Sequence, residues 1–227
     1  MNKDTYVIVP AYNESPVIGA VIRKLQKHYS NIVCVNDGSS DNTADIIKSS
    51  GAILINHAIN LGQGAATQTG VEYCLMQPNA KYFITFDADD QHLVTDAIKL
   101  LACLKKQKLD IVFGSRFLGK TENIPFKKRL MLKCAVHFSN WISGTKLTDT
   151  HIGLRVFNRV FAETLNLTMN DMTHASEIIN RIKQYNYSYS EVPIDVIYSD
   201  YSKSKGQPII NSVNIASDMI MKKITKW

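Results

Sequence analysis

Three carboxylates stand within four positions of the segment ITFDADDQHL, residues 84–93, directly after an apolar run. Asp87 and Asp89 are two residues apart, so in an extended segment their side chains point to the same side. Two carboxylates held that close are stabilised by a cation. Mg²⁺ or Mn²⁺ suits this place, because such ions bind one or two protein carboxylates together with water and substrate phosphates, and Gln91 can add a neutral oxygen. The segment predicts a divalent-metal site; the alternative is a solvated acidic turn that caps the next helix.

Polar loops that contain glycine form a second set of candidates. They are VNDGSSD at 35–41 and NLGQGAA at 60–66, joined by the glycine-free PAYNE at 10–14. Asp37 can accept a hydrogen bond from a nucleobase N–H, and Gly38 permits close approach of a ligand. The loop at 60–66 opens a helix whose free N–H groups can receive a phosphate. Ordinary turn chemistry explains each loop equally well when it is taken alone.

Strands and helices alternate through the first half of the chain and decide where these loops meet. The predicted strands are 5–10, 31–37, 52–57, 81–87 and 110–115. Ser15 and Pro16 are interpreted as the N-cap and first residue of the first helix. This alternation predicts an α/β fold with a mostly parallel sheet covered on both faces. Ligands of such sheets bind at the carboxyl ends of the strands, so we expect the polar segments to share one rim, which favours the metal interpretation.

The second half of the chain is less regular. It carries a basic cluster and a helix in 123–144, a strand at 153–159, a helix at 174–185, a strand at 188–198 and a lysine-bearing loop at 199–208. Apolar residues recur at helical spacing near the C-terminus. We expect one domain over residues 1–208 and a C-terminal amphipathic helix over 209–227, which either lies on a membrane surface or packs on the sheet.

The composition narrows the function classes. The 227 residues are 45% hydrophobic and 20% charged, with a net charge of +6, which suits a globular domain with anionic small molecules or an anionic membrane surface as partners. No apolar run approaches the roughly 18 residues of a membrane-spanning helix, and no signal peptide is evident, so we expect a cytoplasmic protein. The scattered basic residues argue against nucleic acid. Four cysteines without a CxxC pair predict reduced core thiols.

Taken together and in order, these segments resemble glycosyltransferase family 2, and within it the polyprenyl-phosphate glycosyltransferases of the dolichyl-phosphate mannose synthase type. The match rests on VIVPAYNE, VNDGSSDNT, NLGQGAATQTG, FDADDQH and VFGSR over residues 5–116, and continues more weakly through LTDTHIGLRVF (147–157) and EVPIDVIY (191–198). The resemblance implies a GT-A fold, a Rossmann-like and mostly parallel sheet flanked by helices, to which the apolar spacing of 209–227 adds a C-terminal helical appendage. It further implies a nucleotide-sugar donor (UDP or GDP), bound Mg²⁺ or Mn²⁺, and inversion at the anomeric carbon.

On this resemblance, the donor site draws its residues from both halves of the chain. Asp89 and Gln91 are assigned to the metal on the diphosphate. Lys203 and Lys205 are assigned to a basic lid over the diphosphate. The other donor-binding residues that the resemblance implies are Pro10, Tyr12, Glu14, Asp37, Gly38, Gly62, Asp87 and Ala88.

The acceptor of that subgroup is a polyprenyl phosphate, which is already an anionic nucleophile and needs no general base. Arg116 and Arg129 are the candidates to hold its phosphate, since a guanidinium suits bidentate phosphate contact. If the acceptor is instead a hydroxyl of a lipid-linked or surface glycan, a base is required, and Asp149 is the candidate. Arg155 either steadies the acceptor or the diphosphate, or forms a structural ion pair. We expect hexose transfer to a polyprenyl phosphate; the glycan reaction is the alternative, and a sugar-phosphate nucleotidyltransferase is a more distant one.

Some positions depart from the family pattern. Ile152 stands where the family often has a small hydroxyl residue, and Ser199 and Asp200 stand where many lipid-phosphate members have an arginine. Many members of the family carry membrane helices after the C-terminal stretch that corresponds to 209–227, and this sequence shows none there. We therefore expect a peripheral protein at the cytoplasmic face of a membrane, with either a small membrane-protein partner or direct lipid contact. The sequence leaves homo-oligomerisation, the sugar and the base open.

Overall fold

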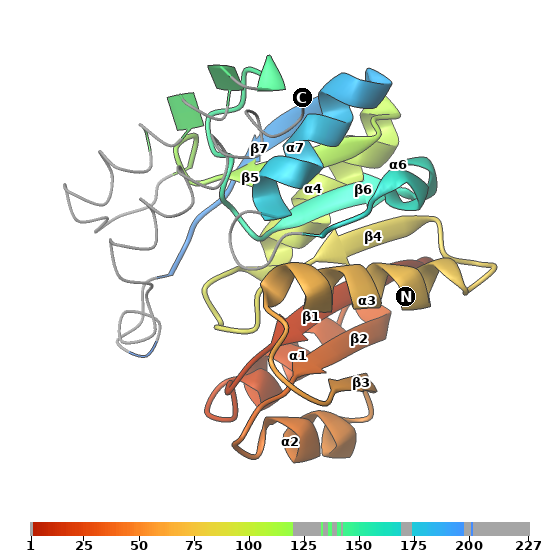
Figure 1. Ribbon diagram of the computed structural model, residues 1–227, viewed down its shortest axis with the longest axis vertical. Coiled ribbons are helices and arrows are strands. Elements are labelled where there is room, and N and C mark those ends of the chain that lie inside the picture. Colours follow the sequence, from red (N-terminus) through yellow and green to blue (C-terminus); the bar gives the residue numbers. More distant parts are fainter. Residues whose placement is uncertain are drawn as a thin grey trace.

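The computed structural model describes residues 2–119, 143–168 and 174–197, together with the single positions 133, 136, 137, 140, 141 and 201. In this part of the chain seven strands form one sheet in the order β3-β2-β1-β4-β6-β5-β7 (Figure 1). The strands are β1 Asn2–Ala11, β2 Tyr29–Asp37, β3 Ile53–His57, β4 Tyr82–Thr85, β5 Ile111–Ser115, β6 Arg155–Asn158 and β7 Tyr189–Pro193. Neighbouring strands are parallel except at β6, which runs antiparallel to β4 and β5. The predicted mostly parallel α/β sheet is confirmed.

Helices cover both faces of the sheet, as Figure 1 shows. The helices are α1 Ile18–Gln26, α2 Thr43–Ser50, α3 Gln63–Leu75, α4 Val94–Gln107, α6 Arg159–Thr164 and α7 His174–Tyr185. Strand β1 contributes alternate side chains to two cores, because successive residues of a strand point to opposite faces. Val7 and Val9 join the core beneath α1, α2 and α4. Tyr6 and Ile8 join the core beneath α3, α6 and α7.

The first helix begins later than predicted. Helix α1 starts at Ile18, with Val17 at its N-cap position. The Glu14 carbonyl oxygen accepts from the N–H groups of Val17 (3.0 Å) and Ile18 (2.9 Å), so residues 14–17 form a turn. The Ser15 N–H donates to Asp41 Oδ2 at 3.1 Å. The prediction of Ser15 as N-cap was therefore wrong, because this loop is tied to the next loop of the sheet instead of to its own helix.

Two other sequence expectations concern thiols and membrane spans. Cys34, Cys74 and Cys103 are free thiols, and burial raises the pKa of both Cys34 and Cys74 to about 12, as befits unreactive core residues. No helix in the described part of the chain is long and apolar enough to cross a membrane. The predicted C-terminal helix at 209–227 and its boundary at residue 208 lie outside the described residues.

Candidate active site

One edge of the sheet collects the loops that carry the candidate residues. Strands β1, β2, β4 and β5 run in the same direction, so their carboxyl ends share this edge. Strand β6 runs the opposite way, and its first residue, Arg155, is paired with Thr85 of β4 and Phe113 of β5. The chain beyond β4 carries Asp87, and the chain beyond β5 carries Arg116. The sequence-predicted common rim is confirmed, and β6 sits between the strand that delivers the acidic segment and the strand that delivers the arginine.

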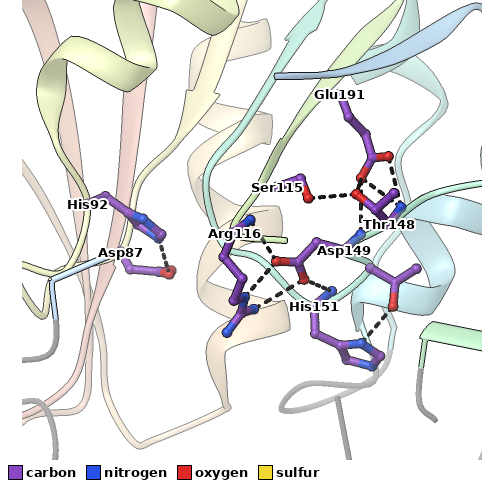
Figure 2. Close-up of polar contacts among 9 residues, drawn as sticks. Asp87, His92, Ser115, Arg116, Thr148, Asp149, His151 and Glu191 are labelled. Carbon is purple, nitrogen blue, oxygen red and sulfur yellow. Dashed lines mark hydrogen bonds and ion pairs between the residues drawn. The ribbon is translucent and has the colours of Figure 1, made fainter. Parts of the chain in front are cut away.

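The Asp87 carboxylate is held by the protein itself. Its Oδ2 accepts from His92 Nε2 at 2.9 Å (Figure 2), and its Oδ1 accepts from Gln63 Nε2 at 2.9 Å. Because an ionised carboxylate only accepts, His92 Nε2 carries a proton and donates a hydrogen bond to Asp87. Burial acts to raise the pKa of Asp87, but the His92 hydrogen bond and the charges of His92, Arg155 and His174 outweigh it and lower the pKa. Asp87 is therefore an ionised residue fixed in orientation.

Asp89 is in the opposite electrostatic situation. Burial, followed by the negative charge of Asp87, raises the pKa of Asp89 to about 6. One oxygen accepts from the Gln91 N–H at 3.1 Å, and in the described part of the chain the other oxygen has no hydrogen bond. A half-buried carboxylate repelled by its neighbour and open on one side fits a hard divalent cation, which prefers oxygen ligands. Described residues offer no cluster of three or more His, Cys, Asp or Glu ligands, so substrate oxygens would have to complete the shell.

Asp37 is held by hydrogen-bond donors of the protein itself. It is 2% exposed, and its two oxygens accept from the N–H groups of Leu61 (2.9 Å) and Gly62 (2.8 Å). His57 Nδ1 lies 2.6 Å from Asp37 Oδ1. The carboxylate thus fastens the glycine loop to the end of β2, and contact with a nucleoside stays a prediction.

Gly38 serves the same junction. Its φ of +68° is in the left-handed region, and a Cβ there would lie 2.4 Å from the carbonyl carbon of Ile59. Only glycine lets the two loop backbones approach so closely. Gly62 opens α3 with a φ of +93°, so both predicted glycines are required by the loops themselves.

The remaining donor candidates come from β1, the loop after it and the segment after β4. Pro10 is within β1, Tyr12 is 46% exposed, and Glu14 and Ala88 are buried. Glu14 Oε2 accepts from the Tyr201 hydroxyl at 2.8 Å. The sequence gives no signal for this contact, which joins positions 187 residues apart. It brings Tyr201 to the loop after β1.

Arg116 and Asp149 form a two-point ion pair on the other side of β6. Arg116 Nε donates to Asp149 Oδ2 at 2.6 Å, and Nη2 donates to Oδ1 at 3.2 Å (Figure 2). The Arg116 backbone N–H also donates to Oδ2, at 3.2 Å. Asp149 is fully buried. A carboxylate with this guanidinium on both oxygens is poorly placed to take a proton from an acceptor hydroxyl.

Glu191 of β7 holds the segment that carries Asp149. Its two oxygens accept from the Thr148 N–H at 2.9 and 2.8 Å, and Oε1 also accepts from Thr148 Oγ1 (2.9 Å) and the Asp149 N–H (3.0 Å). Ser115 Oγ and Thr148 Oγ1 lie 2.6 Å apart, which joins this segment to β5 (Figure 2). Glu191 falls in the EVPIDVIY segment, but nothing in the sequence alone singles it out as a partner of residues 148–149.

His151 is the titratable group next to Asp149. Its Nδ1 lies 2.7 Å from Thr150 Oγ1. Burial lowers the pKa of His151 to about 4, and the charges of Arg155 and Arg116 act in the same direction against the opposing charge of Asp149. The imidazole is neutral at physiological pH and a weak base. Arg129, Lys203 and Lys205 lie outside the described residues, so their assigned roles stay predictions.

The amino-acid sequence was compared with protein families and with individual known proteins. The family model described as "Glycosyl transferase family 2" matches residues 6–167. The chain is 37% identical over 231 residues to the uncharacterized protein MJ1222 of Methanocaldococcus jannaschii, covering 99% of this chain and 94% of that one. It is 31% identical over 247 residues to the UDP-N-acetylglucosamine–dolichyl-phosphate N-acetylglucosaminyltransferase of Methanococcus voltae, covering 99% and 98% respectively.

Among solved structures, a similar fold occurs in glucosyl-3-phosphoglycerate synthase from Mycobacterium tuberculosis, crystallised with Mn²⁺ and UDP-glucose. The TM-score is 0.70 at 13% sequence identity, over 97% of this chain and 78% of that chain. The likeness confirms the predicted GT-A architecture.

Proposed function

Because the chain belongs to glycosyltransferase family 2, we propose that it transfers a sugar from a nucleoside-diphosphate sugar to a polyprenyl phosphate, with a divalent metal on the diphosphate. The observation that carries the choice of acceptor is the Arg116–Asp149 ion pair. The carboxylate that would have to act as base for a hydroxyl acceptor is buried and held on both oxygens. An acceptor phosphate needs no base, so it is compatible with a site whose carboxylate is already engaged by Arg116.

The reaction forms one bond and breaks one. A phosphate oxygen of the acceptor attacks the anomeric carbon from the side opposite the leaving group, and the bond from that carbon to the donor's diphosphate breaks. The products are a polyprenyl-phosphate sugar with inverted configuration and a nucleoside diphosphate. No proton needs to be removed, because the attacking oxygen is already anionic.

The residues of this chain divide the work between the two sides of β6. On the donor side, Asp89 and Gln91 would hold Mg²⁺ or Mn²⁺, which when bound offsets the charge that develops on the leaving diphosphate. Asp87, fixed by His92 and Gln63, keeps this carboxylate pair in place. On the acceptor side, Arg116 offers a guanidinium whose orientation is set by Asp149.

Relatives support the choice of substrates. The Methanococcus voltae enzyme, which aligns with almost the whole of both chains, is named for UDP-N-acetylglucosamine and dolichyl phosphate. We therefore place UDP-sugars ahead of GDP-sugars as donors. A lipid-linked acceptor also supports work at a membrane surface, which agrees with the chain's net charge of +6 because anionic lipid headgroups attract basic proteins.

An assay with the full chain tests this proposal. UDP-N-acetylglucosamine, UDP-glucose and GDP-mannose are each supplied with Mn²⁺ and with undecaprenyl or dolichyl phosphate, and lipid products are identified by mass spectrometry. We expect one sugar to appear on the lipid phosphate together with an equal amount of nucleoside diphosphate. Transfer to a glycan hydroxyl while every polyprenyl phosphate is refused would contradict the proposal.

A further inference from the structure

Arg155 is a buried cation that no carboxylate among the described residues neutralises directly. The residue is 2% exposed. Its Nε is shielded from solvent and has no hydrogen-bond partner among the residues that the structure describes. No ion pair within 4.0 Å is found for it in the described part of the chain, where the arginine pairs are those of Arg116 and Arg159. A structural ion pair, one of the two roles expected for this residue, is therefore not formed with any carboxylate in residues 2–119, 143–168 or 174–197.

Its place in the fold is at the centre of the site. Arg155 is the first residue of β6, between Thr85 of β4 and Phe113 of β5. Beyond its end, β4 leads to Asp87 on one side of Arg155, and β5 leads to Arg116 on the other side. Alternation along β6 puts Arg155 on the same face as Phe157, the face covered by α3 and α7. Gln63 and His174, at the starts of those helices, also act on Asp87 from this face.

The neighbouring carboxylates are already engaged. Asp87 accepts from His92 and Gln63, and Asp149 accepts from Arg116 and the His151 N–H. Their charges act on Arg155 from a distance, and burial is the larger influence: it lowers the pKa of Arg155 to about 10. The guanidinium is still protonated at neutral pH. A buried charge of this kind is unfavourable unless a hydrogen-bonded counter-charge approaches it.

We propose that Arg155 is a phosphate-binding residue whose missing partner is a phosphoryl oxygen of a bound substrate, received between the Asp87 side and the Arg116 side of the site. This inference rests on the proposed function, which brings two phosphate-bearing substrates to this edge of the sheet. The phosphate belongs either to the donor's diphosphate or to the polyprenyl acceptor. A planar guanidinium suits either, because it can present two parallel N–H donors to phosphate oxygens.

Arg159, four residues later, is a matched control that does have partners. Its Nη2 donates to the Leu75 carbonyl (2.8 Å), and Nη1 donates to the carbonyls of Gln77 and Ala80, both at 3.1 Å. Arg159 therefore ties α6 to the end of α3 in the folded protein. Removing it leaves carbonyl groups unsatisfied, so Arg159→Met should lower the melting temperature without changing substrate affinity.

Arg155→Met should behave in the opposite way. Exchanging an unpaired buried charge for an apolar side chain of similar length is expected to leave the melting temperature of the ligand-free protein unchanged or higher. Affinity for the phosphate that Arg155 holds should fall by about 100-fold, the loss of a charge-assisted bidentate contact. Arg155→Lys retains the positive charge but cannot make the bidentate contact, so its affinity for the phosphate should fall by only about tenfold.

Binding measurements distinguish the two phosphates without requiring turnover. Calorimetry with UDP and Mn²⁺ reports on the donor side, and calorimetry with a short-chain prenyl phosphate reports on the acceptor side. We expect Arg155→Met to weaken one of these ligands selectively and Arg159→Met to weaken neither.

Three results would overturn the inference: unchanged affinity for both ligands, a fall in melting temperature like that of Arg159→Met, or failure of Arg155→Met to fold. Wild-type protein that binds these ligands but transfers no sugar to polyprenyl phosphate would instead contradict the proposed function alone.

Discussion

Arg116 Nε lies 2.6 Å from Asp149 Oδ2 in a pair whose side chains are 9% and 1% exposed. Breaking one partner of a buried pair leaves the other charge uncompensated, which typically costs about 3–5 kcal/mol. We predict that Arg116→Met and Asp149→Asn each destabilise the protein by an amount of this order, and that the double variant is much less destabilised than the sum. Chemical denaturation of the four proteins measures this coupling. Simple additivity would show that the pair does not act as a unit.

Asp149→Asn also bears on the reaction. If Asp149 were the base of a hydroxyl-transfer mechanism, its replacement would remove one pH-dependent limb of the kcat/KM profile. Here we expect the shape of the pH profile to be retained and the KM for the acceptor to rise, because Asp149 acts by orienting Arg116. Loss of one limb of the profile in this variant would favour the glycan-hydroxyl alternative.

Glu191 should act on the acceptor side through the segment it holds. Glu191→Gln replaces one acceptor oxygen by an NH₂ donor that faces the Thr148 N–H, so at least one contact is lost, at a cost of about 1–3 kcal/mol. We predict a higher KM for polyprenyl phosphate and unchanged affinity for UDP with Mn²⁺.

Glu163→Gln is the control for this change, since Glu163 is 55% exposed and paired with Arg159 on α6. Exposed pairs contribute at most about 1 kcal/mol. If Glu191→Gln behaved like Glu163→Gln, Glu191 would have no positioning role.

Gly153 leaves room for Asp87 in a way that alanine cannot. A Cβ at this position would lie 2.0 Å from Asp87 Oδ2, so Gly153→Ala must displace the carboxylate. We predict a loss of activity of at least about 100-fold, because misplacement of a site group by roughly 1 Å can cost that much.

Gly51→Ala separates this effect from general destabilisation. Gly51 has a φ of +79° and open space around it, so alanine there is strained but touches nothing; it should lose about 1 kcal/mol of stability and keep its activity. Comparable activity of Gly153→Ala and Gly51→Ala would contradict the close packing of Gly153 against Asp87.

Asp41 predicts a specific dependence of stability on pH. Burial opposes its ionisation, but hydrogen bonds from Thr43 and Ser15 prevail and lower its pKa from 3.8 to about 2. A lowered pKa in the folded state stabilises the fold above the unfolded value, and that contribution is lost as pH falls from about 4 towards 2. Asp41→Asn should therefore be less stable near pH 7 and lose less stability on acidification, as urea denaturation at several pH values can measure. Parallel curves for the two proteins would contradict this assignment.

The fold and the gathering of the acidic and glycine loops follow from local sequence patterns. Continuous apolar strands alternate with helices, and the polar loops come after strand ends, so their common edge is a consequence of parallel pairing. The reversed direction of β6 and its insertion between β4 and β5 depend on pairing between distant segments, which no local period reveals.

Contacts across long sequence separations explain what was missed within the site. Glu191 reaches Thr148 from 43 residues away, and Arg116 meets Asp149 from 33 residues away. The sequence identified Arg116 and Asp149 as candidates in competing reactions, but only tertiary structure makes them partners. Asp37 shows the reverse: its position was predicted, and its partners prove to be the backbone N–H groups of residues 61 and 62.

Acceptor chemistry is the central claim, and one comparison tests it directly: initial rates with a polyprenyl phosphate and with the matching polyprenol, under the same donor, Mn²⁺ and detergent. The alcohol differs only in lacking the phosphate and would need a base. We predict sugar transfer to the phosphate and none to the alcohol from pH 6 to 9. Transfer to the alcohol that disappears in Asp149→Asn would contradict the account.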